Sequence, residues 1–562
     1  MTMHRTLRLL AVLTVCATWL GCESNTPETP DAGTPPDASV PDASVPDASV
    51  PDASIPEWDG TYVPLEEMGG EFDYIDPGRL ASCGFVLPGD GGTGPACGSR
   101  ESFDLTSCET ATLGQLSPTG IYAASTRNDV NSLLFVTNNF MISAVGGPES
   151  HNGDPIVQKQ VDSQGFYLSS LRTLADGGTT LTAYAGCKAE SVQRFTGCFQ
   201  RCINGGARRF QGTFEAERLQ RLGEPESSGG LTLASEHRVE LGFPSDIYVA
   251  KNHAYVVSQD ESDTGLTGGL SVFDVTDRAH PVLRKTVTLT GDSSWNGVWA
   301  KDDALYVTST QRGVLVYDIS NPGDPQFVRS LPGGAASVHT VFVDGERLYA
   351  MHTADNRVLI YDVKAPLQPV LVGSHSVPGT ELASGIPHDA FAYQNRLYIN
   401  QMGQGYFVVD VADPASPRPL GAYEYAVFNN WSHANAVGTF AGRTIAFEGG
   451  EANGAHLRVL DVTDPAKIVK IGEARMRTQT SIHNMVLVGK RLYVAWYADG
   501  VRVFDVANPT QPKQIAHYNS FRDSDPGRTE GLFVGAIGIR VPGDGYVYVV
   551  DVTRGLLILR QP

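Results

Sequence analysis

The second half of the chain repeats one short pattern at a nearly constant spacing. Each copy is a run of alternating apolar residues that ends in an aspartate, as in "GVLVYDI" and "RVLIYDV". A proline-containing turn follows each of six such aspartates, and a further β-rich run follows the turn. The aspartates lie 44 to 51 residues apart and are Asp274, Asp318, Asp362, Asp410, Asp461 and Asp505. Because four short strands in a unit of about 45 residues are typical of a propeller blade, the repeat predicts a β-propeller over residues 229–562.

The repeated strand with its terminal aspartate resembles the LVIVD-repeat family, whose name describes that strand. The resemblance covers residues 231–562 and implies a propeller on a bacterial or archaeal cell surface, without implying an activity. The aspartates raise the question of metal binding. An aspartate before a proline turn is more simply a cap for the backbone N–H groups of that turn, and we expect this role.

The two ends of the repeat region are incomplete in complementary ways. A seventh copy, "YVYVVDVTRGLLILR", stops almost at the C-terminus and lacks a fourth strand. Upstream, "GLTLASEHRVELG" (230–242) is a strand without a blade. Ring closure removes exposed sheet edges, so residues 231–240 are predicted to pair with 555–560. The ring would then have seven blades.

Histidine recurs at one position of the repeat. The second strand of each copy contains Leu-Tyr or an equivalent pair. The ring position is the residue nine positions before the first residue of that pair, or twelve positions before it in the fifth copy, which has a longer turn. In successive copies this residue is Ser245, Asn296, His339, His388, His433 and His483. The first strand of a blade is innermost, so these side chains are predicted to converge at one mouth of the central channel. They would form either a transition-metal site, with Glu448 as a carboxylate partner, or a polar ring that binds neighbouring blades or a ligand. Trp295, Trp431 and Trp496 lie near this position, for ligand contact or for packing between blades.

Residues 57–228 are expected to form a separate, small β-rich domain. They contain six cysteines, Cys83, Cys97, Cys108, Cys187, Cys198 and Cys202, and none follows. Three disulfides of undetermined pairing are favoured over a zinc site at Cys198 and Cys202. Runs such as "GIYAAS" and "TTLTAYAGC" predict antiparallel strands, and "ESVQRFTGCFQRC" (190–202) predicts a short helix. The predicted fold class is therefore all-β, with a seven-bladed propeller after a disulfide-stapled domain.

The N-terminus has the features of an export signal. Residues 1–21 contain Arg5 and Arg8, then the apolar run "LLAVLTVCATWLG". The following Cys22 resembles the modified cysteine of bacterial lipoproteins, which implies a diacylglyceryl anchor; the alternative is an ordinary secretory signal cut nearby. Residues 22–56 repeat a VPDAS-type pentapeptide, and their proline and aspartate content predicts a disordered tether.

The chain as a whole is acidic, with a formal net charge of -20, which argues against nucleic-acid binding. We expect an exported, lipid-anchored protein of the outer membrane or cell surface. Its propeller would be a binding or scaffold module for a protein, peptide or glycan, and this role needs no catalysis. The alternative is a metal-dependent enzyme that uses the histidine ring; the sequence leaves the ligand, the cofactor and the oligomeric state open.

Overall fold

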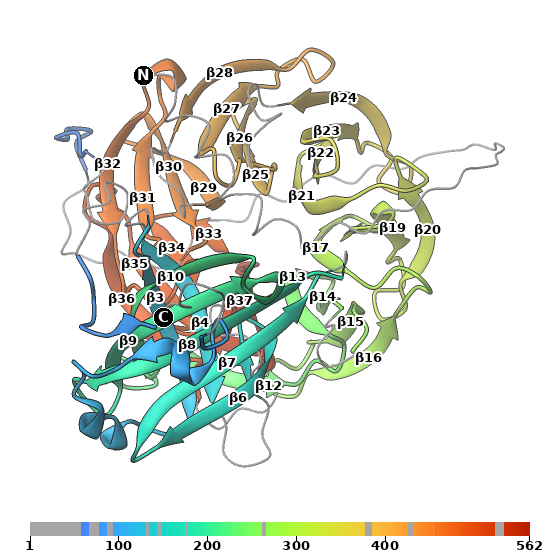
Figure 1. Cartoon of the computed structure of the whole chain (residues 1–562). Helices are drawn as coiled ribbons and strands as arrows, with labels where there is room; N and C mark the ends of the chain where they lie inside the picture. The colour runs from blue at the N-terminus through green and yellow to red at the C-terminus, as the bar shows by residue number, and fades with distance from the viewer. Residues whose placement is uncertain are drawn as a thin grey trace.

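The computed structural model of the chain consists of two β units (Figure 1). The described residues are 58–66, 78–86, 94–130, 134–142, 149–174, 177–260, 266–376, 385–424, 431–452, 455–522 and 533–562. The predicted signal peptide, Cys22 and the tether to residue 56 lie outside them. Within these ranges, no helix has the length and hydropathy needed to cross a membrane.

The first unit is a closed barrel of eight antiparallel strands. The strands are β3 (Gly120–Asn128), β4 (Leu134–Ile142), β5 (Ser150–His151), β6 (Asp154–Asp162), β7 (Gly165–Thr173), β8 (Thr179–Ala189), β9 (Arg194–Ile203) and β10 (Arg208–Arg218). Aromatic side chains fill the interior, and Tyr122, Phe140, Tyr184, Phe195 and Phe214 are completely buried there. The barrel is therefore a packed core.

The predicted helix at 190–202 is wrong, because this segment contributes most of β9. The strand pairs with both β8 and β10. Phe195 and Phe199 pack in the barrel core, whereas Cys198 and Cys202 form disulfides to the segment before the barrel. Side chains four residues apart share a face in a helix and in a strand alike, so the Phe and Cys spacings did not discriminate between the two.

The three predicted disulfides are present, and they join the segment before the barrel to β8 and β9. The pairs are Cys83–Cys198, Cys97–Cys202 and Cys108–Cys187. This segment contains two short strands, β1 (Gly84–Phe85) and β2 (Phe103–Asp104), and buries Phe103 against Tyr167 and Ala183. It has little regular structure of its own, so cross-links that close long loops give it much of its order. Three disulfides also indicate that the chain folds in an oxidising compartment.

The second unit is a seven-bladed β-propeller, as predicted, and six blades are four-stranded meanders of consecutive strands. Blade 1 contains β13 (Phe243–Ala250), β14 (His253–Gln259), β15 (Gly269–Asp274) and β16 (Val282–Val287), and blade 2 contains β17 (Trp295–Lys301), β18 (Ala304–Ser309), β19 (Gly313–Asp318) and β20 (Gln326–Leu331). Blade 3 contains β21 (Val338–Asp344), β22 (Arg347–His352), β23 (Arg357–Asp362) and β24 (Val370–Ser376), and blade 4 contains β25 (Asp389–Tyr393), β26 (Arg396–Asn400), β27 (Tyr406–Asp410) and β28 (Arg418–Tyr423). Blade 5 contains β29 (Ser432–Phe440), β30 (Arg443–Gly450), β31 (Leu457–Asp461) and β32 (Val469–Ala474), and blade 6 contains β33 (Met485–Val488), β34 (Arg491–Ala495), β35 (Val501–Asp505) and β36 (Lys513–Tyr518).

Blade 7 joins the two ends of the propeller. Its inner strands are β37 (Ala536–Arg540), β38 (Tyr546–Asp551) and β39 (Gly555–Arg560), and its outer strand is β12 (Thr232–His237). β12 runs antiparallel to β39, with Leu233 opposite Leu559 and His237 opposite Leu556. This pairing confirms the predicted closure. β11 (Ser227–Ser228) then pairs with β36 as a fifth strand of blade 6.

The repeated aspartates cap turns, as expected. In each of the six copies a carboxylate oxygen accepts the backbone N–H two residues later, at 2.7–3.0 Å. These backbone hydrogen bonds are the largest cause of the lowered pKa of Asp274, Asp318, Asp362 and Asp410. The aspartates therefore end the third strand of blades 1 to 6 and serve the fold.

The two units contact each other directly. Ile121, Met141 and Leu219 of the barrel unit pack with Ala498, Phe521 and Val534, which lie in loops of blades 6 and 7. The segment 58–66 instead contacts blade 5, where Trp58 joins the core cluster and Arg443 Nε donates to the Gly60 carbonyl at 2.9 Å. The chain thus contacts the propeller before it enters the barrel.

Candidate functional site

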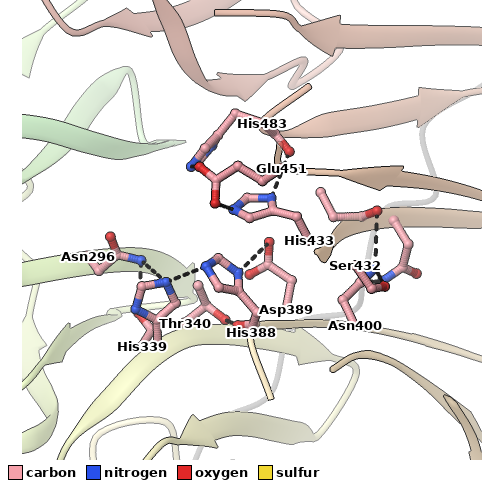
Figure 2. Close-up of polar contacts among 12 residues, drawn as sticks. Asn296, His339, Thr340, His388, Asp389, Asn400, Ser432, His433, Glu451 and His483 are labelled. Carbon is pink, nitrogen blue, oxygen red and sulfur yellow. Dashed lines mark hydrogen bonds and ion pairs between the residues drawn. The ribbon is translucent and has the colours of Figure 1, made fainter. Parts of the chain in front are cut away.

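The first strands of the blades bring the four predicted histidines together in the central channel (Figure 2). The ring centroids of successive imidazoles are 4.1 Å apart for His339 and His388, 4.0 Å for His388 and His433, and 4.3 Å for His433 and His483. Each histidine comes from a different blade, at or just before the start of its first strand. The common offset in the repeat places them at a common height because each blade repeats the same backbone path.

Side chains of this ring hydrogen-bond to the backbone of the next blade. The Nδ1 atom of His433 lies 3.1 Å from the carbonyl oxygen of His483, and Nδ1 of His483 lies 3.0 Å from that of Ile537. Ser245 donates to the carbonyl of Asn296 at 3.0 Å, and Asn296 to that of His339 at 3.3 Å. The ring therefore connects blades, which was one of the two interpretations of its sequence pattern.

The hydrogen bonds also determine which nitrogen of each imidazole carries a proton. A carbonyl oxygen can only accept, so Nδ1 of His433 and of His483 must donate. In the neutral imidazole, Nε2 then carries a lone pair, and in both residues Nε2 lies on the side of Glu451. Burial lowers the pKa of His483 well below its usual value, so its ring is neutral.

His339 and His388 form a second, direct pair. Their Nε2 atoms are 2.7 Å apart, and Asn296 Nδ2 lies 3.1 Å from Nε2 of His339. A hydrogen bond between the two Nε2 atoms requires a proton on one of them, and the amide nitrogen of Asn296, which can only donate, favours His388 as the donor. Burial is the main cause of the strongly lowered pKa of both rings, and the nearby imidazoles add to it. His388 Nδ1 lies 3.8 Å from a carboxylate oxygen of Asp389.

The glutamate at the ring is Glu451, and the expected partner Glu448 lies elsewhere. Glu448 is completely buried within blade 5, where it pairs with Arg458 at 2.9 Å and accepts from Ser432 Oγ at 2.9 Å. Glu451 follows β30 and places Oε2 at 3.5 Å from Nε2 of His433. Burial raises its pKa above the usual range.

The position three residues after each ring residue forms a second layer along the channel. In blades 1 to 4 this position is aromatic, and the residues are Tyr248, Trp299, Phe342 and Phe391. Successive ring centroids are 5.0, 4.7 and 4.8 Å apart. In blade 7, Arg540 lies three residues after Ile537, whose carbonyl accepts from His483. The Arg540 guanidinium lies over Trp299 at 5.2 Å and pairs with Asp246 at 3.2 Å. We call the four rings the aromatic arc.

The aromatic arc and two of the ring histidines, His388 and His483, line one cavity of about 250 Å³. All four arc residues are half-buried and line the cavity, as do Arg540, Asn296, His388 and His483. The cavity is therefore apolar on one side, carries the ion pair of Arg540 and Asp246, and is rich in hydrogen-bonding groups at the ring. Convergent polar groups in a mainly apolar hollow are typical of ligand sites.

The tryptophans that the sequence suggested are not the aromatic residues of this cavity. Trp295 and Trp496 are completely buried in cores between blades, which agrees with packing, one of the two roles that the sequence suggested, and not with ligand contact. Trp431 is partly exposed before β29, and its carbonyl accepts from the N–H of Glu451 at 2.8 Å. Ser245 is also buried, with its hydroxyl used between blades. The offset that located the histidines, extended by three residues, would have located the arc.

A model of the LVIVD repeat matches four segments of this chain, residues 242–288, 293–331, 385–424 and 482–520. These segments correspond to blades 1, 2, 4 and 6, so the chain is a seven-bladed propeller that contains LVIVD repeats. No curated protein matches the sequence.

Among solved structures, the WD40 β-propeller domain of Doa1 is 11% identical with a TM-score of 0.43, over 59% of this chain and 98% of that one. A protein from Lactobacillus plantarum is 14% identical with a TM-score of 0.42, over 55% and 87%. The computationally designed Ika8 protein is 12% identical with a TM-score of 0.41, over 59% and 100%.

Proposed function

We propose that this protein is an exported binding protein whose propeller takes up a ligand in the central channel. The single observation that carries the proposal is the aromatic arc facing a cavity whose inner wall is the polar ring. The arc is continuous over four blades, and its half-buried rings leave part of their surface open to the cavity. Partly open aromatic surface beside hydrogen-bonding groups is what a ligand with one apolar and one polar side requires.

The chemistry of the cavity favours a glycan. A sugar ring has an apolar C–H face that packs on aromatic rings and hydroxyl groups that bind amides, imidazoles and a guanidinium. A cavity of about 250 Å³ has room for one such ring at the end of a longer chain. A peptide that inserts one apolar side chain is the second candidate, since it would use the arc and leave the polar ring unused.

Binding to immobilised oligosaccharides and to a displayed peptide library tests the proposal. Phe342→Ala removes the centre of the arc, and the matched control is Phe327→Ala, an exposed phenylalanine on β20 at the outer edge of blade 2. We expect saccharide binding that falls at least about tenfold in Phe342→Ala and is unchanged in Phe327→Ala. Binding of the protein to peptides and not to oligosaccharides would identify a peptide as the ligand. Equal loss or equal retention in both variants would contradict a ligand site in the channel.

We also propose that a lipid on Cys22 holds the protein at the outer membrane or cell surface, with residues 22–56 as the tether. The basic and apolar residues before Cys22 and the three disulfides of the barrel unit support export. Metabolic labelling with palmitate should mark the wild-type protein and leave Cys22→Ser unlabelled. Equal labelling of the two proteins would rule out this anchor.

A further inference from the structure

We infer that Nε2 of His433, Nε2 of His483 and the carboxylate of Glu451 form a binding site for a divalent first-row transition-metal ion. The site lies at the histidine ring of the channel and so rests on the proposed function, to which it adds an ion at the polar end. Two imidazoles and one carboxylate suit zinc and other first-row metals and leave at least one position open.

The first argument is the direction of the lone pairs. His433 and His483 both use Nδ1–H to bind a backbone carbonyl of the next blade. Metal-binding histidines commonly have such a partner, because it determines the tautomer and the orientation of the ring. This leaves both Nε2 atoms on the side of the same carboxylate. An Nε2 atom and a carboxylate oxygen that face each other need a proton or a metal ion between them, and two such nitrogens on one carboxylate suit a metal ion.

The second argument is spacing. Nε2 of His433 lies 3.5 Å from Oε2 of Glu451, and Nε2 of His483 lies 3.9 Å from Oε1. Both distances are too long for an N–H···O hydrogen bond. Ligand atoms at about 2.0–2.2 Å from a tetrahedral ion are separated by about 3.4 Å, close to the first of these values. The ligand atoms of all three residues lie within 4.8 Å of one another.

The third argument is burial without a partner. His433 is 1% exposed, and in the described part of the chain its Nε2 has no hydrogen-bond partner. A buried nitrogen without a hydrogen-bond partner is unfavourable, and an ion would offset that cost. The carboxylate is held in turn, because the Tyr497 hydroxyl donates to Oε1 of Glu451. Each proposed ligand thus has an outer partner that orients it.

A neighbouring group of similar composition, His388, Asp389 and His433, fits an ion less well. His388 Nε2 is already paired with His339 at 2.7 Å, and its Nδ1 lies beside Asp389, the residue next to it in sequence. Only the group with Glu451 has both histidine nitrogens directed by backbone carbonyls. We therefore assign the ion to His433, His483 and Glu451.

The chain itself supplies a conservative substitution for the test. Asn296 occupies the equivalent ring position of blade 2, and its Nδ2 donates to the carbonyl of His339 as the histidine Nδ1 atoms do in blades 5 and 6. His433→Asn and His483→Asn should therefore keep the bond between blades and remove only Nε2. Glu451→Gln keeps an acceptor for Tyr497 and removes the negative charge. His339→Asn changes a ring histidine outside the proposed site and is the matched control.

The experiment uses the full chain purified without a histidine tag. Metal content is measured as isolated, and then after chelation and titration with Zn²⁺ or Co²⁺, with the visible absorption of Co²⁺ as a second readout. We expect about one ion per chain in the wild type and in His339→Asn. We expect the affinity to fall more than about 100-fold in His433→Asn, His483→Asn and Glu451→Gln, since even outer partners of metal ligands contribute about 10–100-fold.

Either of two results would overturn the assignment. One is a wild-type chain that binds neither ion; a proton on Glu451 would then satisfy the site. The other is a metal content that His483→Asn and Glu451→Gln leave unchanged. These results can be told apart from a failure of the proposed function. If the chain binds saccharide but no metal, only the metal site is disproved. Saccharide loss in Phe342→Ala with metal retained is the expected behaviour of two distinct parts of one channel.

Discussion

Nδ1 of His433 lies 3.1 Å from the carbonyl oxygen of His483, so a single imidazole links blade 5 to blade 6 and turns its other nitrogen toward Glu451. The same relationship recurs between His483 and Ile537 of blade 7. A structural and a ligand-binding role are therefore compatible in one side chain, because the two nitrogens of the ring are used separately.

The first prediction separates these two nitrogens in the metal-free protein. His433→Ala leaves the buried carbonyl of His483 without its donor and should destabilise the propeller by about 1–2 kcal/mol. His433→Asn should retain most of the stability, because its amide can replace Nδ1. Tryptophan fluorescence during urea unfolding reports the propeller, since residues 78–228 contain no tryptophan. Equal stability of the two variants would show that the hydrogen bond contributes nothing.

The second prediction concerns ring closure at blade 7. Glu236 on β12 pairs with Arg554, whose side chain is 1% exposed, in the turn before β39. Glu236→Ala leaves this guanidinium buried with only its neutral partners, Tyr518 and Ser520, and should cost about 2 kcal/mol of propeller stability. Glu240→Ala is the control, because the Glu240 side chain is 67% exposed and its ion pair with Arg238, at 3.9 Å, is long and open to solvent. The same unfolding midpoint in both variants would mean that the pair does not support closure.

The third prediction is a pH dependence of the barrel. His151 bonds Ser170 Oγ and the Tyr184 hydroxyl at 2.9 Å each, and burial, with a smaller effect of Arg201, lowers its pKa from 6.5 to about 3. Between these two pKa values, the unfolded chain binds a proton on His151 that the folded barrel does not bind. Barrel stability should therefore fall as the pH falls from about 6.5 toward 3, by at most about 1.4 kcal/mol per pH unit.

Hydrogen exchange of β7 and β8 measures this dependence. His151→Gln should flatten it, because glutamine can still bond Tyr184 and does not titrate. His280→Gln should leave it intact, because the His280 side chain is 82% exposed. An unchanged slope in His151→Gln would assign the pH dependence to other groups.

The fourth prediction concerns the disulfides, which lie entirely in the first unit. Removing one pair, as in Cys108→Ser with Cys187→Ser, should destabilise the barrel by about 2–5 kcal/mol. Faster hydrogen exchange in β8 and β9 would report the loss. The fluorescence transition of the propeller should not move, because no cysteine follows Cys202. A coupled shift of both units would show instead that the contact of Ile121 and Leu219 with Phe521 makes them one cooperative unit.

Much of the propeller could be predicted because each blade is local in sequence. Four strands that follow one another pair with their neighbours, so their alternating pattern, their aspartate turns and their spacing are enough to define a blade. Closure by β12 followed from counting strands and from the cost of an open edge. The height of the histidines followed from the repeat alone, since equivalent residues of equivalent blades lie at equivalent positions.

Only the tertiary structure decided which groups meet between blades. Glu448 and Glu451 are three residues apart, yet the first is buried with Arg458 inside blade 5 and the second faces His433 and His483. Spacing could not distinguish them, because β30 ends between them and the direction of the following loop depends on the packing of blade 6. The disulfide pairs likewise depended on how an irregular segment lies on the barrel. Sequence by itself determines what repeats along the chain, whereas contacts between different blades arise only when the ring closes.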